Sequence, residues 1–136
     1  MVHSNIVYKG SLRCEATHGP SGQTIFTDAP KDNMGKGEAF SPTDLVGAAL
    51  GACMLTIIGI VGKKSNIAVD DAKAHVTKEM TTEGVRRIKK LAVTITFPKN
   101  YSDKEKKLLE NAALTCPVHK SLHPDVESPV QFVYPN

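Results

Sequence analysis

Cys53 and Cys116 are the residues of this chain whose type and position suggest chemistry. Cys53 lies inside an uncharged run from Leu45 to Gly62, and Cys116 directly precedes Pro117. A helix that begins at Pro117 would have Cys116 as its N-cap, where free amide groups and the helix dipole would stabilise a thiolate. A single buried cysteine is usually a small apolar residue. Two thiols on helices that pack on the same sheet can meet, and this favours redox chemistry.

A metal ion is the alternative use of the same atoms. Cys116, His119 and His123 follow a C-x2-H-x3-H spacing, and Cys53 could complete four zinc ligands. Structural zinc sites usually show two tight ligand pairs, whereas Cys53 stands alone in an apolar run. We therefore expect no metal and no other cofactor, and we interpret the two histidines as surface residues.

The uncharged run predicts a long helix that carries Cys53. Ser41 is a good N-cap for it, and Pro42 and Asp44 suit its first and third positions. Asp44 and Cys53 are nine residues apart, which at about 100° per residue places them on opposite faces. Asp44 is therefore expected to cap the helix and not to assist the thiol.

This run is also the one membrane signal, because about 18 apolar residues can cross a bilayer. Its four glycines, three alanines and one threonine dilute its hydropathy, so we expect a core helix and no membrane segment. A helix that is apolar on every side must be covered on every side. We expect a second copy of the chain to complete the cover, with Gly47 and Gly51 allowing close backbone approach at that contact.

Alternating and helical patterns predict the remaining elements. Strands are expected at residues 6–9, 12–16, 23–27, 72–77, 91–97 and 130–134, with turns at 9–10 and 83–84 and a long loop at 28–40. A capping box from Ser102 to Glu105 opens a helix that leads to Cys116, and Pro117 can start another. The order β-β-β-α-β-β-α-α-β predicts one α+β domain over residues 1–136.

The composition is that of an ordinary globular chain. Hydrophobic residues make up 40% and charged residues 23%, and the net charge of +3 is too small to indicate nucleic acid binding. The first ten residues contain no apolar stretch of signal-peptide length, so we expect a cytoplasmic protein. Three cysteines are too few for a disulfide-stapled secreted domain. In a reducing cytoplasm, a disulfide between two of them would be transient and catalytic.

The segments that contain the two cysteines are GKGEAFSPTDLVGAALGAC and AALTCPVHKSL. They resemble the OsmC/Ohr family of thiol-dependent hydroperoxide reductases, and the similarity covers nearly the whole chain. The resemblance implies an OsmC-like fold, in which antiparallel sheets wrap around central helices in an intertwined homodimer. It also implies active sites at the dimer interface, with the N-terminal strands contributing to the partner's sheet.

The resemblance further implies a two-cysteine mechanism. In the family's peroxidases, the cysteine of the first long helix attacks the hydroperoxide and becomes a sulfenic acid. The cysteine before proline then resolves it to a disulfide. By motif position these are Cys53 and Cys116. An arginine stabilises the thiolate, and a carboxylate holds the arginine.

One site position, that of the carboxylate, differs from the family's pattern. Another, that of the arginine, is not specified by it. The family's carboxylate usually follows the proline that opens the helix, and here that position is Thr43. Glu38, in the preceding loop, is the expected substitute. Arg13, on an early strand, is the expected cation, and Cys14 would then point to the opposite side of that strand. Either Arg13 or the Glu38 loop could reach Cys53 of the other chain.

Three other cations are weaker candidates for the same role. Lys31 lies in the long loop, and Arg86 and Arg87 stand at a hairpin, where we expect them to face solvent.

The function that we predict is reduction of organic hydroperoxides, with an external dithiol as reductant. Leu50, Met54 and Ile57 are expected to line the surroundings of Cys53, and such an apolar lining favours alkyl substrates over hydrogen peroxide. The alternative is a non-catalytic dimer that binds a small apolar ligand or serves as a stress-related scaffold. Thr43 at the carboxylate position motivates that alternative.

Overall fold

A computed structural model describes all 136 residues, which form two compact units, residues 1–46 and 47–136. Each unit is described by itself. The order of the strands and helices is the predicted one, with one additional 3-10 turn, η1 (Lys31–Asn33). The predicted α+β class is therefore confirmed. That residues 1–136 form a single domain stays a prediction.

The first unit is built on a three-stranded antiparallel sheet in the order β1-β2-β3. Its strands are β1 (Ser4–Gly10), β2 (Arg13–His18) and β3 (Thr24–Asp28). The first turn lies at Ser11 and Leu12, not at residues 9–10 as predicted, and both have positive φ, 54° and 62°. Two successive left-handed residues give a turn whose twist matches that of the flanking strands, which explains why the turn lies here.

The loop over residues 29–40 folds back on the end of β3. The Asp28 amide donates a hydrogen bond to the Phe40 carbonyl at 3.2 Å, so both ends of the loop lie side by side. Inside the loop the chain passes so closely that a Cβ on Gly35 would lie 1.6 Å from the Ala29 carbonyl oxygen. Only glycine fits there, and the loop is consequently compact.

The second unit contains the sheet β4-β5-β6, made of β4 (Lys73–Met80), β5 (Ile88–Thr96) and β6 (Val130–Val133). Strands β4 and β5 form the predicted hairpin, in which the Thr81 amide donates to the Arg87 carbonyl at 2.9 Å. Strand β6, however, pairs with β5 in parallel. The expectation of purely antiparallel sheets is wrong for this pair. Two helices connect β5 to β6, and a crossover of that length allows the chain to re-enter in the same direction.

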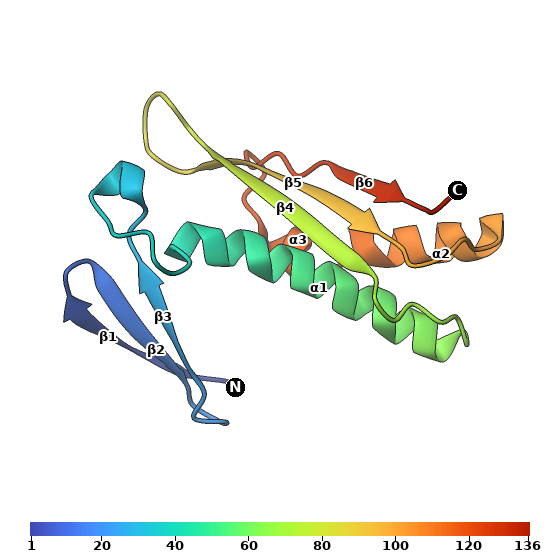
Figure 1. Cartoon of the computed structure of the whole chain (residues 1–136), viewed down its shortest axis with the longest axis horizontal. Coiled ribbons are helices and arrows are strands. Elements are labelled where there is room, and N and C mark those ends of the chain that lie inside the picture. Colours follow the sequence, from blue (N-terminus) through green and yellow to red (C-terminus); the bar gives the residue numbers. More distant parts are fainter. The chain divides into compact units, whose positions relative to one another are not determined.

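Helices α1 (Pro42–Lys64) and α2 (Asp103–Leu114) lie on one face of this sheet (Figure 1). The side chains between the helices and the sheet form the core. Its fully buried apolar members include Leu50, Met54, Ile58, Leu91, Ile95 and Leu109. The predicted capping box of α2 is confirmed, because the Glu105 amide donates to Ser102 Oγ and the Ser102 amide donates to Glu105 Oε2.

Gly47 and Gly51 have a different role from the one we expected. A Cβ on Gly51 would lie 3.0 Å from Val76 Cγ2, and a Cβ on Gly47 would lie 3.4 Å from Leu91 Cδ2. Both glycines therefore face the sheet of their own chain. Their small size lets α1 pack closely on β4 and β5, so the prediction that they serve a contact between two chains is wrong.

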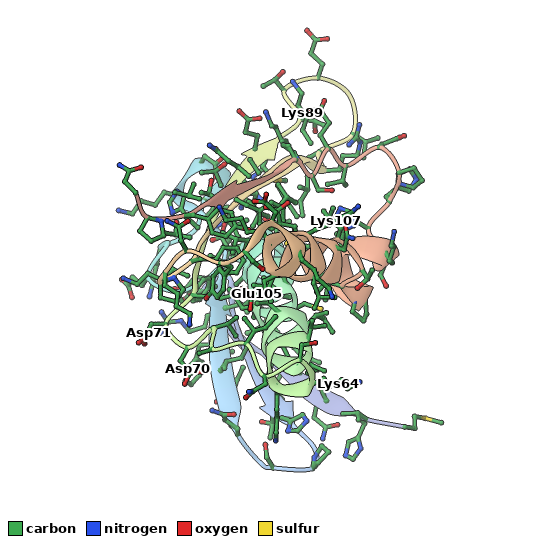
Figure 2. All side chains as sticks on the ribbon, turned by 90° about the vertical axis from the view of Figure 1, so that its right-hand side faces the viewer. Lys64, Asp70, Asp71, Lys89, Glu105 and Lys107 are labelled. Carbon is green, nitrogen blue, oxygen red and sulfur yellow. The ribbon has the colours of Figure 1, made fainter.

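By length and composition alone, α1 could cross a membrane, since its most apolar 18-residue window has a mean hydropathy of 2.3. The core helix of a globular protein can have the same length and composition, so one such helix does not identify a membrane span. One face of α1 packs on the sheet, but only 33% of that window is buried within the chain. Charged, exposed residues follow at once: Lys64 in the last turn, then Asp70 and Asp71 on the loop before β4 (Figure 2).

Candidate active site

The structure brings Cys53 and Cys116 together in the second unit. Cys53 lies at the middle of α1 and is half-buried. Cys116 is completely buried and lies between α2 and α3 (Pro117–Ser121). The two side chains are neighbours, since Cys53 raises the pKa of the Cys116 thiol, and all three cysteines of the chain are unpaired thiols. The pair therefore has the proximity that thiol–disulfide chemistry requires.

Cys116 is the N-cap of α3, as predicted. The His119 amide donates a hydrogen bond to Cys116 Sγ at 3.2 Å. The cap acts in the expected direction, because the amides of His119 and Val118 lower the pKa of the Cys116 thiol. Burial raises this pKa by more, and the neighbouring Cys53 also raises it, so the pKa lies above its ordinary value.

A second cluster of predicted residues lies in the first unit. Strands β2 and β3 pair so that Arg13 stands directly opposite Asp28. Arg13 Nε donates to Asp28 Oδ1 at 2.7 Å, and Arg13 Nη2 donates to Asp28 Oδ2 at 2.8 Å. Nη2 also donates to Glu38 Oε2 at 3.3 Å. The contact expected between Arg13 and Glu38 exists, but Asp28 is the closer partner.

Asp28 was not among the predicted site residues. Its side chain is 1% exposed, whereas that of Glu38 is 64% exposed. A buried carboxylate needs a partner, and an acidic residue among strand residues was the available signal. That signal becomes specific only when the register of β2 and β3 is known, because only then does Asp28 face Arg13.

The ion pair keeps both groups charged. The hydrogen bond from Arg13 lowers the pKa of the Asp28 carboxyl, and this effect exceeds the opposing effect of burial. The hydrogen bond to Asp28 raises the pKa of Arg13. Arg13 Nη1 takes no part in the three hydrogen bonds to the carboxylates. Its N–H groups point along the edge of the guanidinium that Asp28 leaves uncovered.

The start of α1 is capped as predicted. The Asp44 amide donates to Ser41 Oγ at 3.0 Å, and the Ser41 amide donates to Asp44 Oδ2 at 2.9 Å. This reciprocal pair confirms that Asp44 caps the helix. Thr43, at the position where we expected the family's carboxylate, has its Oγ1 3.2 Å from Ser41 Oγ. Its hydroxyl thus belongs to the same capping group.

The weaker candidate cations lie on exposed segments. Arg86 and Arg87 are exposed on the β4–β5 hairpin, as expected, and Arg87 Nη1 donates to the Ile88 carbonyl at 3.0 Å. Lys31 is exposed on η1 and packs beside Gly37. Cys14 is half-buried on β2.

Of the three residues expected to line the surroundings of Cys53, Leu50 and Met54 are fully buried in the core of the second unit, and Ile57 is half-buried. That they line the thiol stays a prediction.

The histidines that could have been zinc ligands lie in different surroundings. No group of three or more His, Cys, Asp or Glu side chains is arranged to hold a metal ion. His123 is exposed, as expected, and its Nδ1 accepts a hydrogen bond from the Asp125 amide at 3.1 Å. His119 is not the simple surface residue that we expected. It is half-buried, its Nε2 lies 3.0 Å from Ser128 Oγ, and its Nδ1 is buried without a partner.

Comparisons with known proteins place this geometry in a family. The sequence profile of the OsmC family, described as OsmC-like protein, matches residues 35–129. A crystal structure from Psychrobacter arcticus 273-4, provisionally named an osmotic stress induced and detoxification response protein, is 48% identical in sequence and gives a TM-score of 0.91. The match covers 97% of this chain and 96% of that one. No curated protein matches the chain.

More distant structures share the fold. An organic hydroperoxide resistance protein OsmC from Legionella pneumophila is 17% identical, with a TM-score of 0.75 and coverage of 98% and 96% of the two chains. An organic hydroperoxide resistance protein from Elizabethkingia anophelis is 15% identical, with a TM-score of 0.73 and coverage of 99% and 96%. These two show the fold alone. Together with the profile match and the 48% identical structure, they lead to one conclusion: the chain belongs to the family of OsmC-like proteins.

Proposed function

We propose that this protein is a thiol-dependent peroxidase that reduces organic hydroperoxides with two cysteines. The observation that carries the proposal is the proximity of two unpaired thiols, Cys53 on α1 and Cys116 at the N-cap of α3. Membership of the OsmC-like family agrees with it, and so do the names of the structural relatives, several of which are organic hydroperoxide resistance proteins.

The proposed reaction has three steps. The Cys53 thiolate attacks one oxygen of the hydroperoxide, the O–O bond breaks, and the other oxygen takes a proton and leaves as the alcohol. Cys53 is then a sulfenic acid. The Cys116 thiol attacks this sulfur, water leaves, and a disulfide forms. An external dithiol supplies two electrons and two protons by exchange and is itself oxidised to a disulfide.

The difference in burial suits these two roles. A thiolate and not a thiol is the nucleophile, and burial keeps Cys116 protonated. Cys116 therefore does not compete for the peroxide. When a sulfenic acid forms beside it, its proton passes to the departing hydroxyl group, which leaves as water while the Cys116 sulfur bonds to Cys53. Cys53 is the more accessible of the pair and meets the substrate.

Arg13 supplies the positive charge in this mechanism. A cation favours the thiolate and stabilises the oxygen that leaves. Asp28 binds Arg13 through two hydrogen bonds and keeps it in place, which limits the reorganisation needed when charge develops.

The working form in this proposal is a homodimer. In the first unit, six large apolar side chains of the sheet and its first turn are exposed, namely Ile6, Val7, Tyr8, Leu12, Ile25 and Phe26. In the second unit, Ala48, Ala52, Thr56 and Ile60 form an exposed stripe on α1 at four-residue spacing. Exposed apolar surface of this extent favours association, and a second copy of the chain can bury it.

The direct test is consumption of cumene hydroperoxide by the reduced protein in the presence of a dithiol. We expect turnover by the wild type and none by Cys53→Ser. Cys14→Ser, which removes the third thiol, is the matched control and should keep full activity. Equal turnover by Cys53→Ser and the wild type would rule out the assignment.

A stoichiometric pulse of hydroperoxide separates this proposal from the alternative of a non-catalytic dimer. The enzyme should form one Cys53–Cys116 disulfide per chain, measured by peptide mass spectrometry. A dimer that only binds a small apolar ligand or acts as a scaffold should form none.

A further inference from the structure

Asp28 is a buried carboxylate with several hydrogen-bond partners. It accepts hydrogen bonds from Arg13 Nε, from Arg13 Nη2 and, at 3.2 Å, from the Glu38 amide. Its own amide donates to the Phe40 carbonyl. One residue thus holds the guanidinium with its side chain and closes the loop over residues 29–40 with both its side chain and its backbone.

Glu38 holds the same arginine far less firmly. Its carboxylate makes one contact with Arg13, at 3.3 Å, and is 64% exposed. A single exposed contact lets the guanidinium turn, whereas two parallel bonds to one carboxylate fix its plane. The position of Glu38 itself depends on Asp28, because the Asp28 side chain accepts the hydrogen bond of the Glu38 amide. Asp28 therefore helps to position Glu38.

We propose that Asp28, and not Glu38, is the positioning residue that orients Arg13 for the thiol chemistry, and that it couples this orientation to closure of the loop over residues 29–40. The inference rests on the proposed function, in which Arg13 stabilises the Cys53 thiolate. The Nε and Nη2 edge of Arg13 is occupied by Asp28. What Asp28 determines is therefore the direction in which the Nη1 donors point.

The experiment measures how fast iodoacetamide alkylates each cysteine of the reduced protein at pH 7, by peptide mass spectrometry. The variants are Asp28→Asn, which keeps the shape but places an NH2 group against Arg13, and Glu38→Gln as the matched control. We expect Asp28→Asn to slow alkylation of Cys53 severalfold, because the cation that favours the thiolate is no longer held in one orientation. Glu38→Gln should slow it by less than about twofold, because it removes one exposed contact.

Alkylation of Cys14 shows whether an effect of Asp28→Asn is merely structural. If Asp28→Asn unfolds the unit, alkylation of Cys14 becomes faster, since Cys14 is half-buried on the strand that carries Arg13. A positioning effect instead slows Cys53 and leaves Cys14 unchanged. Arg13→Gln completes a double-mutant cycle: if Asp28 acts through Arg13, Asp28→Asn has no further effect on Cys53 in the Arg13→Gln background.

Arg13→Lys keeps the inference testable if Asp28→Asn does not fold. Lysine retains the charge but lacks the planar fork, so the orientation set by Asp28 is lost and Cys53 should slow as in Asp28→Asn. Wild-type alkylation of Cys53 in both Asp28→Asn and Arg13→Lys would overturn the inference, as would a larger effect of Glu38→Gln. Alkylation needs no peroxide. Absence of peroxide turnover in the wild type would therefore overturn the proposed function while leaving these rates to decide the role of Asp28.

Discussion

Cys53 and Cys116 are neighbouring side chains, but Cys116 is completely buried and Cys53 only half-buried. This asymmetry suits the order of the two cysteines in the proposed reaction, in which Cys53 attacks the peroxide and Cys116 resolves the product.

Replacing the buried thiol should stop the cycle after its first step. In Cys116→Ser, Cys53 still attacks the hydroperoxide but no disulfide can form, so we expect a burst of about one equivalent of peroxide per chain and then strongly reduced turnover. Trapping with dimedone and intact-mass measurement should detect the sulfenic acid. Wild-type turnover in Cys116→Ser would contradict the resolving role.

The acidity of Cys116 gives a second prediction. Burial raises its pKa first of all, and the Cys53 side chain raises it further. In Cys53→Ala only the second cause is removed, so the pKa of Cys116 should fall but stay above its usual value. The pH profile of Cys116 alkylation should move to lower pH, yet remain above that of the urea-unfolded protein. A profile that does not move would show that Cys53 has no effect on this thiol.

Close packing of α1 on the sheet can be tested at its glycines. In Gly51→Ala the new Cβ would lie 3.0 Å from Val76 Cγ2 and 3.4 Å from the Ala74 Cβ, so we expect a loss of about 1–3 kcal/mol in the free energy of unfolding. Gly47→Ala is the matched control. Its nearest neighbours are at 3.4 and 3.5 Å, an ordinary contact, and the helical alanine should stabilise by up to about 1 kcal/mol. Urea titration measures both, and equal effects would contradict the packing argument.

Features that depend on a few adjacent residues could be predicted from the sequence. Both capping boxes, at Ser41 and Ser102, and the N-cap position of Cys116 follow from local residue patterns, and all three are present. The role of Asp28 could not be predicted, because it depends on the register between β2 and β3. The raised pKa of Cys116 was missed for a related reason, since burial is set by how distant elements pack.

Asp28 should also make stability depend on pH. Arg13 lowers the pKa of Asp28 in the folded protein. The stability contributed by this carboxylate is therefore present above its unfolded pKa of about 3.9 and is lost as the pH falls through the lower, folded value. We expect the melting temperature of Asp28→Asn to lie below that of the wild type at pH 7, and the difference to shrink below about pH 4. Calorimetry at several pH values measures this, and Glu38→Gln should show little difference at any pH. A gap that persists unchanged at pH 2.5 would show that the ion pair is not its cause.

The assembly itself can be tested on the exposed stripe of α1. Ile60 is 45% exposed in the single chain, and the proposed homodimer buries it. A glutamate there would carry an unpaired charge into an apolar contact. Sedimentation at micromolar concentration should show the wild type at twice the 14.7 kDa mass of the chain. Ile60→Glu should dissociate to single chains or aggregate, and should lose peroxidase activity at the same time.

Val85→Glu is the matched control, since Val85 is an apolar residue that is 83% exposed on the β4–β5 hairpin, away from that stripe. It should keep both the mass and the activity of the wild type, because its charge stays in solvent. If the wild type sediments as a folded single chain, the homodimer is wrong. If Ile60→Glu keeps the mass of two chains, this face of α1 is not where they meet.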